Sequence, residues 1–105
     1  MNGYQITFFT QQNRRHHQQP LAEWLLLSAR NLGIGGATII SATEGYGHDR
    51  RIHSAHFFEL ADQPQEVVMT ASEEEAQRLF DFLAQEDIRI FYVKVPVEYG
   101  VIGKA

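Results

Sequence analysis

The sequence contains no cysteine. This absence excludes disulfide scaffolds, thiolate zinc sites and thiol nucleophiles, and it fits a reducing compartment. Long hydrophobic runs are also absent, since apolar stretches such as Trp24–Leu27 are far shorter than the roughly 20 residues that a membrane-spanning helix requires. No basic segment followed by an apolar one opens the chain. We therefore expect a cytoplasmic protein without a membrane span.

The sequence also lacks an excess of positive charge. Nine basic residues stand against thirteen acidic ones, which gives a formal net charge of -4. This sign argues against a domain that holds nucleic acid mainly through phosphate contacts and leaves open only a local basic patch. Only three prolines and eight glycines are present and 44% of the residues are hydrophobic, so collagen-like and disordered chains are excluded too. With 105 residues, we expect a single domain over 1–105, with its core at about 4–97 and a tail at 98–105.

The first third of the chain predicts a strand, a loop and a helix. Tyr4–Thr10 is rich in β-branched and aromatic residues that alternate with polar ones, which is typical of a strand. Gln11–Gln19 contains no apolar residue and is predicted to be a surface loop. After Pro20, apolar residues recur at helical spacing over Leu21–Leu32, and Gly33 supplies a helix stop.

The middle of the chain predicts strands bracketed by glycines. Ala37–Thr43 is a β-branched run entered through Gly35 and Gly36, and Ser54–Leu60 and Glu66–Ala71 are two further strand-like runs. The stretch between the first two runs is polar and basic and predicts an exposed loop.

The last third predicts a capped helix and a final strand. Ser72 is an N-cap residue, and Glu75 stands three residues later as its capping-box partner. The helix then carries an apolar stripe, and Ile88–Val97 is the final strand. The stripe consists of Ala76, Leu79, Phe80 and Leu83.

Together these elements predict an α+β fold with the order β-α-β-β-α-β and an elaborated central hairpin. Two amphipathic helices need one face of a mainly antiparallel four-stranded sheet, which is the ferredoxin-like arrangement. The other face of so apolar a sheet also needs cover on a chain this small. We therefore expect a homo-oligomer in which a partner subunit supplies that cover.

Glycines and arginines in the centre of the chain are the strongest chemical signal. The glycines within Gly33–Gly36 and Glu44–Gly47 let a backbone approach a ligand closely, and Arg50 and Arg51 can pair with an anion. The alternative is that these glycines only shape a helix-to-strand turn and a hairpin tip. No nucleophile elbow of the Gly-x-Ser-x-Gly kind is present, so we expect a protein that is not an enzyme.

The five histidines are predicted to lie on the surface. His16 and His17 are adjacent, and His53 and His56 are three apart, so in a regular strand they point to opposite faces. A metal site formed by His48, His53 and His56 stays open as an alternative, because an assembly of subunits can bring separated side chains together.

The motifs of the central segment resemble those of the PII-like proteins. Gly33-Ile34-x-Gly36-x-Thr38, Glu44-Gly45-Tyr46-Gly47 and Arg50-Arg51-Ile52-His53 are most similar to the uncharacterised family called domain of unknown function 190. Asp62-Gln63-Pro64 continues the similarity, which covers roughly Tyr4–Val97.

This resemblance implies a ferredoxin-like homotrimer that binds an adenine nucleotide between subunits and acts on a transporter or enzyme through an exposed loop. It implies no resident cofactor. In classical PII proteins a Gly-Asp-Gly-Lys segment cradles the phosphates, whereas Gln85–Arg89 stands here, with Arg89 in place of the lysine charge and two acidic neighbours that repel a triphosphate. The implied ligand-binding residues are Gly36, Thr38, Glu44, Gly45, Gly47, Arg50, Arg51 and Arg89.

Two other functions fit the sequence. One is a metal-binding trimer of the divalent-cation tolerance type, which shares the architecture and needs the three separated histidines to converge. The other is an interaction module that binds only proteins and no small ligand.

Overall fold

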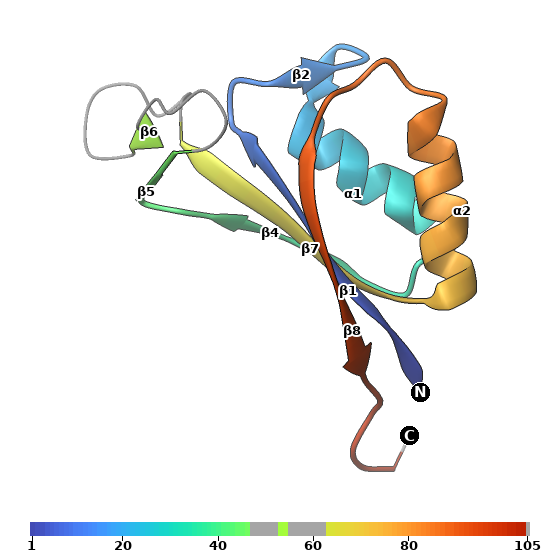
Figure 1. Ribbon diagram of the computed structural model, residues 1–105. Helices are drawn as coiled ribbons and strands as arrows, with labels where there is room; N and C mark the ends of the chain where they lie inside the picture. Colours follow the sequence, from blue (N-terminus) through green and yellow to red (C-terminus); the bar gives the residue numbers. More distant parts are fainter. Residues whose placement is uncertain (47–52, 55–62, 105) are drawn as a thin grey trace.

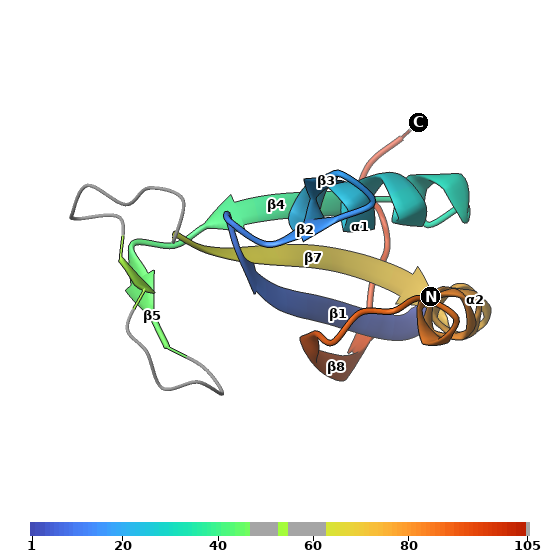
Figure 2. The same cartoon turned by 90° about the horizontal axis from the view of Figure 1, so that it is seen from above.

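The computed structural model of the protein describes residues 1–46, 53–54 and 63–104. A four-stranded sheet has the order β4-β7-β1-β8, and every neighbouring pair is antiparallel (Figures 1 and 2). Two further pairs of two-residue strands form small hairpins. The sheet strands are β1 (Asn2–Gln11), β4 (Ala37–Ser41), β7 (Pro64–Ser72) and β8 (Phe91–Glu98). The hairpins are β2 (Arg15–His16) with β3 (Gln19–Pro20), and β5 (Glu44–Gly45) with β6 (His53–Ser54).

The two helices complete the predicted fold. Helix α1 (Leu21–Asn31) connects β1 to β4, and α2 (Glu73–Ala84) connects β7 to β8. Strand β7 lies between β4 and β1 and runs antiparallel to both. This arrangement is the ferredoxin-like β-α-β-β-α-β plan, and the α+β class, element order and one-sided placement of the helices predicted from the sequence are confirmed.

Alternation along β1 decides which face of the sheet is buried. Ile6 and Phe8 are fully buried, whereas Phe9 is 38% exposed on the opposite face. Because side chains alternate strictly along a strand, the register of β1 with β7 and β8 extends this division across the sheet. One face of the sheet therefore carries the core and the other faces outward.

Helix α1 ends where the sequence predicted. Gly33 has a φ of +85°, its N–H donates to the Arg30 carbonyl, and the Ile34 N–H donates to the Ala29 carbonyl. This pair of bonds is a Schellman motif, which needs a left-handed residue that glycine adopts at low cost. Ile34, buried just after the turn, joins the core.

Helix α2 begins with the predicted capping box. The Glu75 N–H donates to Ser72 Oγ over 3.1 Å, and the Ser72 N–H donates to Glu75 Oε1 over 2.7 Å. Both bonds satisfy backbone donors that a helix start leaves without intrahelical partners.

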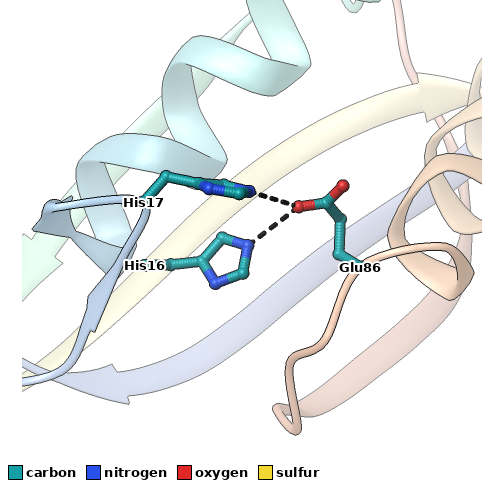
Figure 3. Close-up of side chains that lie close together, drawn as sticks. All are labelled: His16, His17 and Glu86. Carbon is teal, nitrogen blue, oxygen red and sulfur yellow. Dashed lines mark hydrogen bonds and ion pairs between the residues drawn. The ribbon is translucent and has the colours of Figure 1, made fainter.

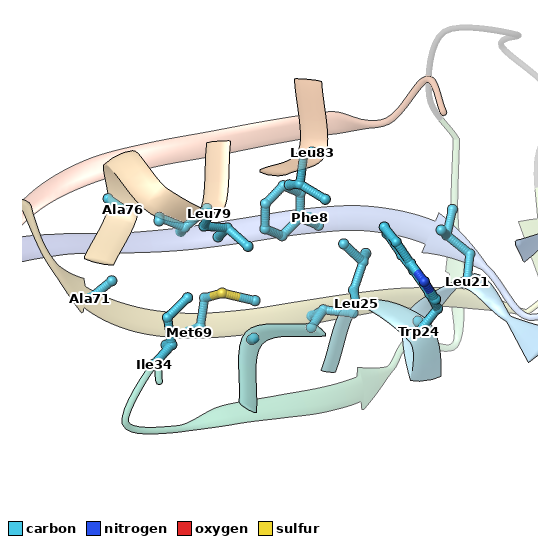
Figure 4. Packing of buried hydrophobic residues seen from close by; sticks show 14 residues of the cluster. Phe8, Leu21, Trp24, Leu25, Ile34, Met69, Ala71, Ala76, Leu79 and Leu83 are labelled. Atoms are coloured by element: carbon cyan, nitrogen blue, oxygen red, sulfur yellow. The ribbon is translucent and has the colours of Figure 1, made fainter. Parts of the chain in front are cut away.

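The core lies between the two helices and one face of the sheet (Figure 4). Helix α1 packs mainly against β4 and β7, and α2 packs against β7 and β1. Trp24, on the apolar stripe of α1, is only 7% exposed and is part of the core. Fully buried side chains at the centre of the core are Ile6, Phe8, Leu25, Val67, Met69 and Leu79.

Strands β1 and β7 extend one or two residues beyond both of their predicted ends, and the boundaries of β4 and β8 also differ from the sequence predictions. Strand β4 ends at Ser41 instead of Thr43: the Ala42 N–H donates to the Pro64 carbonyl, but proline has no N–H to donate in return, so the ladder stops. Strand β8 begins at Phe91 instead of Ile88, because Ile88 and Ile90 pack against the core without strand pairing.

The predicted surface loop Gln11–Gln19 was wrong in part, because it contains β2 and the first residue of β3. Of the predicted strand Ser54–Leu60, only Ser54 lies within the described residues. In the described part of the chain, no helix is both long and apolar enough to cross a membrane.

We predict that Ser72→Ala lowers the free energy of unfolding by about 1 kcal/mol, because the first turn of α2 loses its side-chain acceptor. Denaturant unfolding measures this loss. Glu74→Ala is the matched control, because it removes an exposed charge from the same turn and leaves the capping box intact. An unchanged free energy of unfolding in Ser72→Ala, or an equal loss in both variants, would contradict a specific contribution from the cap.

Candidate functional site

The first group of predicted site residues lies along the β4 edge of the sheet. Gly36 immediately precedes β4, and Thr38 lies within it, and both are exposed. A Cβ atom added at Gly36 would meet nothing within 4 Å, and its φ is not in the left-handed region. The packing of a single chain therefore does not require glycine at this position, which leaves the backbone open to a ligand or another subunit.

Glu44 and Gly45 lie beyond the end of β4, in the β5–β6 hairpin. Glu44 pairs with Ser54, and Gly45 pairs with His53 (Figure 1). Gly45 is half-buried, and a Cβ atom there would lie 3.7 Å from the Pro64 side chain, an ordinary contact. The pairing places Glu44 and Gly45 in a strand at the base of a hairpin, whereas the glycine pattern had predicted a hairpin tip.

Arg89 lies near the opposite edge of the sheet, two residues before the edge strand β8. Thr38 shares a row with Val68, Thr7 and Val93, one residue from each strand. The two edges are thus three strand spacings apart, about 14 Å. One chain cannot place Thr38 and Arg89 on the same phosphate group.

The remaining predicted residues fall outside the described ones. These are Gly47, His48, Arg50, Arg51 and His56, and for His53 only its place in β6 is described. The assignments of Arg50 and Arg51 to an anion, and of the three histidines to a metal, therefore remain predictions.

The sheet face away from the helices is apolar and uncovered in the single chain. Phe9, Ile40, Phe91, Val93 and Val95 are between 38% and 53% exposed, and the rings of Phe9 and Phe91 lie 5.6 Å apart between centroids. By strand alternation, all of them point away from the side that holds Ile6 and Phe8. We call these five residues the open face. Glu66 of β7 stands between Ile40 and Phe9 in their row, whereas the four open-face residues other than Ile40 lie on the adjacent strands β1 and β8. Exposed apolar side chains gathered on two adjacent strands are typical of a subunit interface.

A hollow of about 340 Å³ lies at the other end of the sheet and contains none of the predicted residues. Its walls include Tyr4, Pro96 and the acidic residues Glu73 and Glu98, and none of its lining residues is basic. This composition does not suit an anionic ligand.

His16, His17 and Glu86 form the one close group of metal-ligating side chains among residues 1–46, 53–54 and 63–104 (Figure 3). The Nε2 atoms of His16 and His17 lie 2.9 Å and 2.8 Å from the same atom, Glu86 Oε1. We call these three residues the His-His-Glu cluster. Its side chains come from the β2–β3 hairpin and from the segment that follows α2.

A tight turn brings the two adjacent imidazoles to the same side of the chain. His17 and Gln18 are the two turn residues of the β2–β3 hairpin, and their φ angles are +49° and +65°. Positive φ at both positions is the signature of a type I′ turn, which usually carries asparagine and glycine. The His16 ring then packs edge-on against Trp24, with centroids 4.4 Å apart.

The electrostatics of the cluster favour a charged carboxylate. Hydrogen bonds from His16 and then from His17 hold the pKa of Glu86 below its usual value, and this effect exceeds the opposing effect of desolvation. Glu86 is therefore an anion with two imidazoles at its Oε1 atom.

The sequence did not reveal this cluster, and the prediction that both histidines are surface residues was wrong for His16. The His16 side chain is only 12% exposed, against 63% for His17. The polar segment around them predicted full exposure, and their partner Glu86 is about 70 residues away. A pair of adjacent histidines was the only local signal.

Comparison with known proteins places this fold in a family. The model of DUF190, described as "Uncharacterized ACR", matches residues 3–92. A UPF0166 protein of Aquifex aeolicus (strain VF5) is 27% identical over an alignment of 97 residues that covers 84% of this chain and 92% of that protein.

Solved structures share the fold at lower identity. A PII-like signalling protein from Thermus thermophilus superposes with a TM-score of 0.67 at 20% identity, over 91% of this chain and 87% of that one. CPII, a nitrogen regulatory PII-like protein from Thiomonas intermedia solved with ADP, AMP and bicarbonate, has a TM-score of 0.54 at 20% identity, over 92% and 89%. The chain thus has the fold of the PII-like proteins, and it belongs to the DUF190 family.

Proposed function

We propose that this protein is a PII-like regulatory protein that binds a small anionic ligand, an adenine nucleotide, between the subunits of a homotrimer. It acts as a binding protein and not as an enzyme. The observation that carries this proposal is the position of Thr38 and Arg89 at opposite edges of the sheet. Residues so placed act on one ligand only where the β4 edge of one subunit approaches the β8 edge of another.

The open face supports the oligomer on which this site depends. Phe9, Phe91 and Val93 lie on the two adjacent strands β1 and β8 and are exposed in the single chain. Burial of these side chains by another subunit stabilises the oligomer by about 25 cal/mol for each Å² of apolar surface that is removed from water. The number of three subunits comes from the likeness to PII-like proteins.

The chemistry at the two edges fits a nucleotide with few phosphate charges. Gly36 offers an unobstructed backbone, Thr38 a hydroxyl, and Arg89 a guanidinium that can pair with phosphate in a bidentate manner. Glu86 and Asp87 lie beside Arg89, so each further phosphate charge meets more repulsion. We therefore expect AMP and ADP to bind more tightly than ATP. CPII, which shares the fold, was solved with ADP and AMP.

The β5–β6 hairpin is the segment that we propose contacts a protein partner. Glu44 and Gly45 follow the β4 edge directly, so a ligand held at that edge lies next to the base of the hairpin. We assign the recognition of a transporter or enzyme to the loop that this hairpin carries.

We predict that AMP or ADP raises the midpoint of thermal unfolding of tag-free, metal-stripped protein by several degrees and in a saturable way, because a ligand of the folded state stabilises it by mass action. Gly36→Ala is expected to leave the midpoint without ligand unchanged, since the added Cβ meets nothing, and to reduce the shift with nucleotide. Arg50→Ala, Arg51→Ala and Arg89→Ala are expected to reduce the shift as well.

Arg30→Ala is the matched control, because Arg30 is an exposed arginine in the last turn of α1. It is not one of the residues proposed to bind the nucleotide. It is expected to retain the full shift. Unchanged midpoints with AMP, ADP and ATP would reject nucleotide binding, and full shifts in all four site variants would reject the assigned residues.

We predict that Val93→Asp converts the oligomer to monomers at micromolar concentration, because a buried unpaired charge at the open face costs several kcal/mol. Analytical ultracentrifugation measures the change. Asn31→Asp adds the same charge at an exposed position at the end of α1 and is expected to leave the assembly intact. An unchanged oligomer in Val93→Asp, or a wild-type monomer, would contradict the role of the open face.

A further inference from the structure

We propose that the His-His-Glu cluster is a binding site for a divalent transition-metal ion of the zinc class. The ligand atoms are Nε2 of His16, Nε2 of His17 and a carboxylate oxygen of Glu86. This site is separate from the predicted histidine set His48, His53 and His56. It shares no ligand with the proposed nucleotide site, although Glu86 lies only three residues before Arg89.

The distances within the cluster are close to those of a coordination shell. All three ligand atoms lie within 4.8 Å of one another, and the two nitrogens lie 2.9 Å and 2.8 Å from the shared oxygen. With metal–nitrogen and metal–oxygen bonds near 2.0 Å, neighbouring ligands in a tetrahedral zinc site are about 3.3 Å apart. To admit the ion, each N···O contact lengthens by about half an ångström, and the two nitrogens, which lie within 4.8 Å of each other, adjust to the same separation of about 3.3 Å.

The side chains are held in place from both sides. The His16 ring packs against Trp24, which in turn stacks on Phe82 of α2 with ring planes 23° apart. On the other side, the Glu86 N–H donates to the Leu83 carbonyl, so Glu86 is tied to the end of α2. A metal ligand whose position is set before binding loses little conformational freedom when the ion arrives.

The two segments that carry the ligands are also joined directly. Arg14 donates through its guanidinium to the Arg89 carbonyl over 2.6 Å, which links the β2–β3 hairpin to the segment between α2 and β8. Arg15 donates to the Gln18 carbonyl over 2.7 Å and braces the turn. The turn itself places non-glycine residues at positive φ, which costs free energy that a bound ion would offset.

The donor set selects the kind of metal. Two imidazole nitrogens and one carboxylate are the three protein ligands of a common class of four-coordinate Zn²⁺ site, whereas Mg²⁺ and Ca²⁺ prefer oxygen alone. The negative charge of Glu86 compensates part of the charge of the ion. Because the His17 side chain is 63% exposed, the site faces solvent, and a water molecule can take the fourth position.

The competing explanation is that Glu86 only ties the hairpin to the rest of the fold by accepting two N–H bonds. The two explanations differ in what replaces the imidazole protons. A structural tie needs Nε2–H on both rings, whereas a metal site needs both Nε2 lone pairs. Only the metal site predicts saturable binding of the ion with defined stoichiometry.

The test is a titration of tag-free, chelator-treated protein with Zn²⁺ by isothermal titration calorimetry, in the absence of nucleotide. We expect one equivalent per chain at micromolar concentration. With Co²⁺ as the probe, we expect visible absorption from a four-coordinate site that added Zn²⁺ abolishes. Mg²⁺ is expected to give no saturable heat.

His17→Gln and Glu86→Gln are the decisive variants, because His17 is largely exposed and both changes keep a polar side chain of similar length. Each is expected to weaken Zn²⁺ binding at least tenfold, since changes even to residues that only support a metal ligand cost about that much. The matched control replaces His48, His53 and His56 together with alanine and is expected to bind Zn²⁺ as the wild type does.

Binding that survives in both decisive variants, binding lost in the control, or no saturable heat in the wild type would overturn the proposal. Far-ultraviolet circular dichroism and the unfolding midpoint without metal show whether each variant is folded. Should His17→Gln not fold, His17→Asn and the Co²⁺ spectrum of the wild type decide the question. A failure here leaves the nucleotide proposal untouched, since the titration contains no nucleotide.

Discussion

The strict alternation of side chains along β1 is the constraint on which the rest of the structure depends. β1 is a central strand, paired with β7 on one side and with β8 on the other. Ile6 and Phe8 point into the core, so Phe9 and its neighbours on the other strands must point away from it. The two helices cover the first face at β1 and β7, whereas Tyr92 on β8 stays 47% exposed, and no helix in the described part of the single chain covers the second face. The strand order, with β1 and β7 in the middle, separates the two halves of the proposed ligand site, because β4 and β8 are the edges of the sheet, Thr38 lies in β4 and Arg89 lies two residues before β8. An assembly of several copies of the chain would explain both the open face and the separation of Thr38 from Arg89.

The segment between α2 and β8 connects the two proposals in space. It carries Glu86 of the His-His-Glu cluster and, three residues later, Arg89 of the proposed nucleotide site. Arg14 donates to the Arg89 backbone, so the hairpin that holds the histidines also braces this segment. The proposed metal and nucleotide sites are thus neighbours on one loop while sharing no ligand.

Local patterns predicted most of the fold because their causes are local. The capping box at Ser72, the glycine stop at Gly33 and the apolar stripes of both helices depend on residues within one or two turns. The limits of the strands were less predictable. Pro64, a residue of the neighbouring strand β7, ends the pairing of β4. Ile88 and Ile90 follow the alternation of a strand because both pack against the core, although they precede the paired residues of β8.

The sequence by itself determined the fold class, the element order, the helix ends and the resemblance to PII-like proteins, because hydrophobic period, capping and motif are properties of neighbouring residues. Tertiary structure alone decided that Thr38 and Arg89 lie at opposite edges and that His16, His17 and Glu86 meet. The cluster depends on a positive-φ turn in a segment that is polar throughout, and on a carboxylate that the end of α2 supplies from about 70 residues away. Contacts between segments so distant depend on how the helices pack on the sheet, which no local pattern encodes.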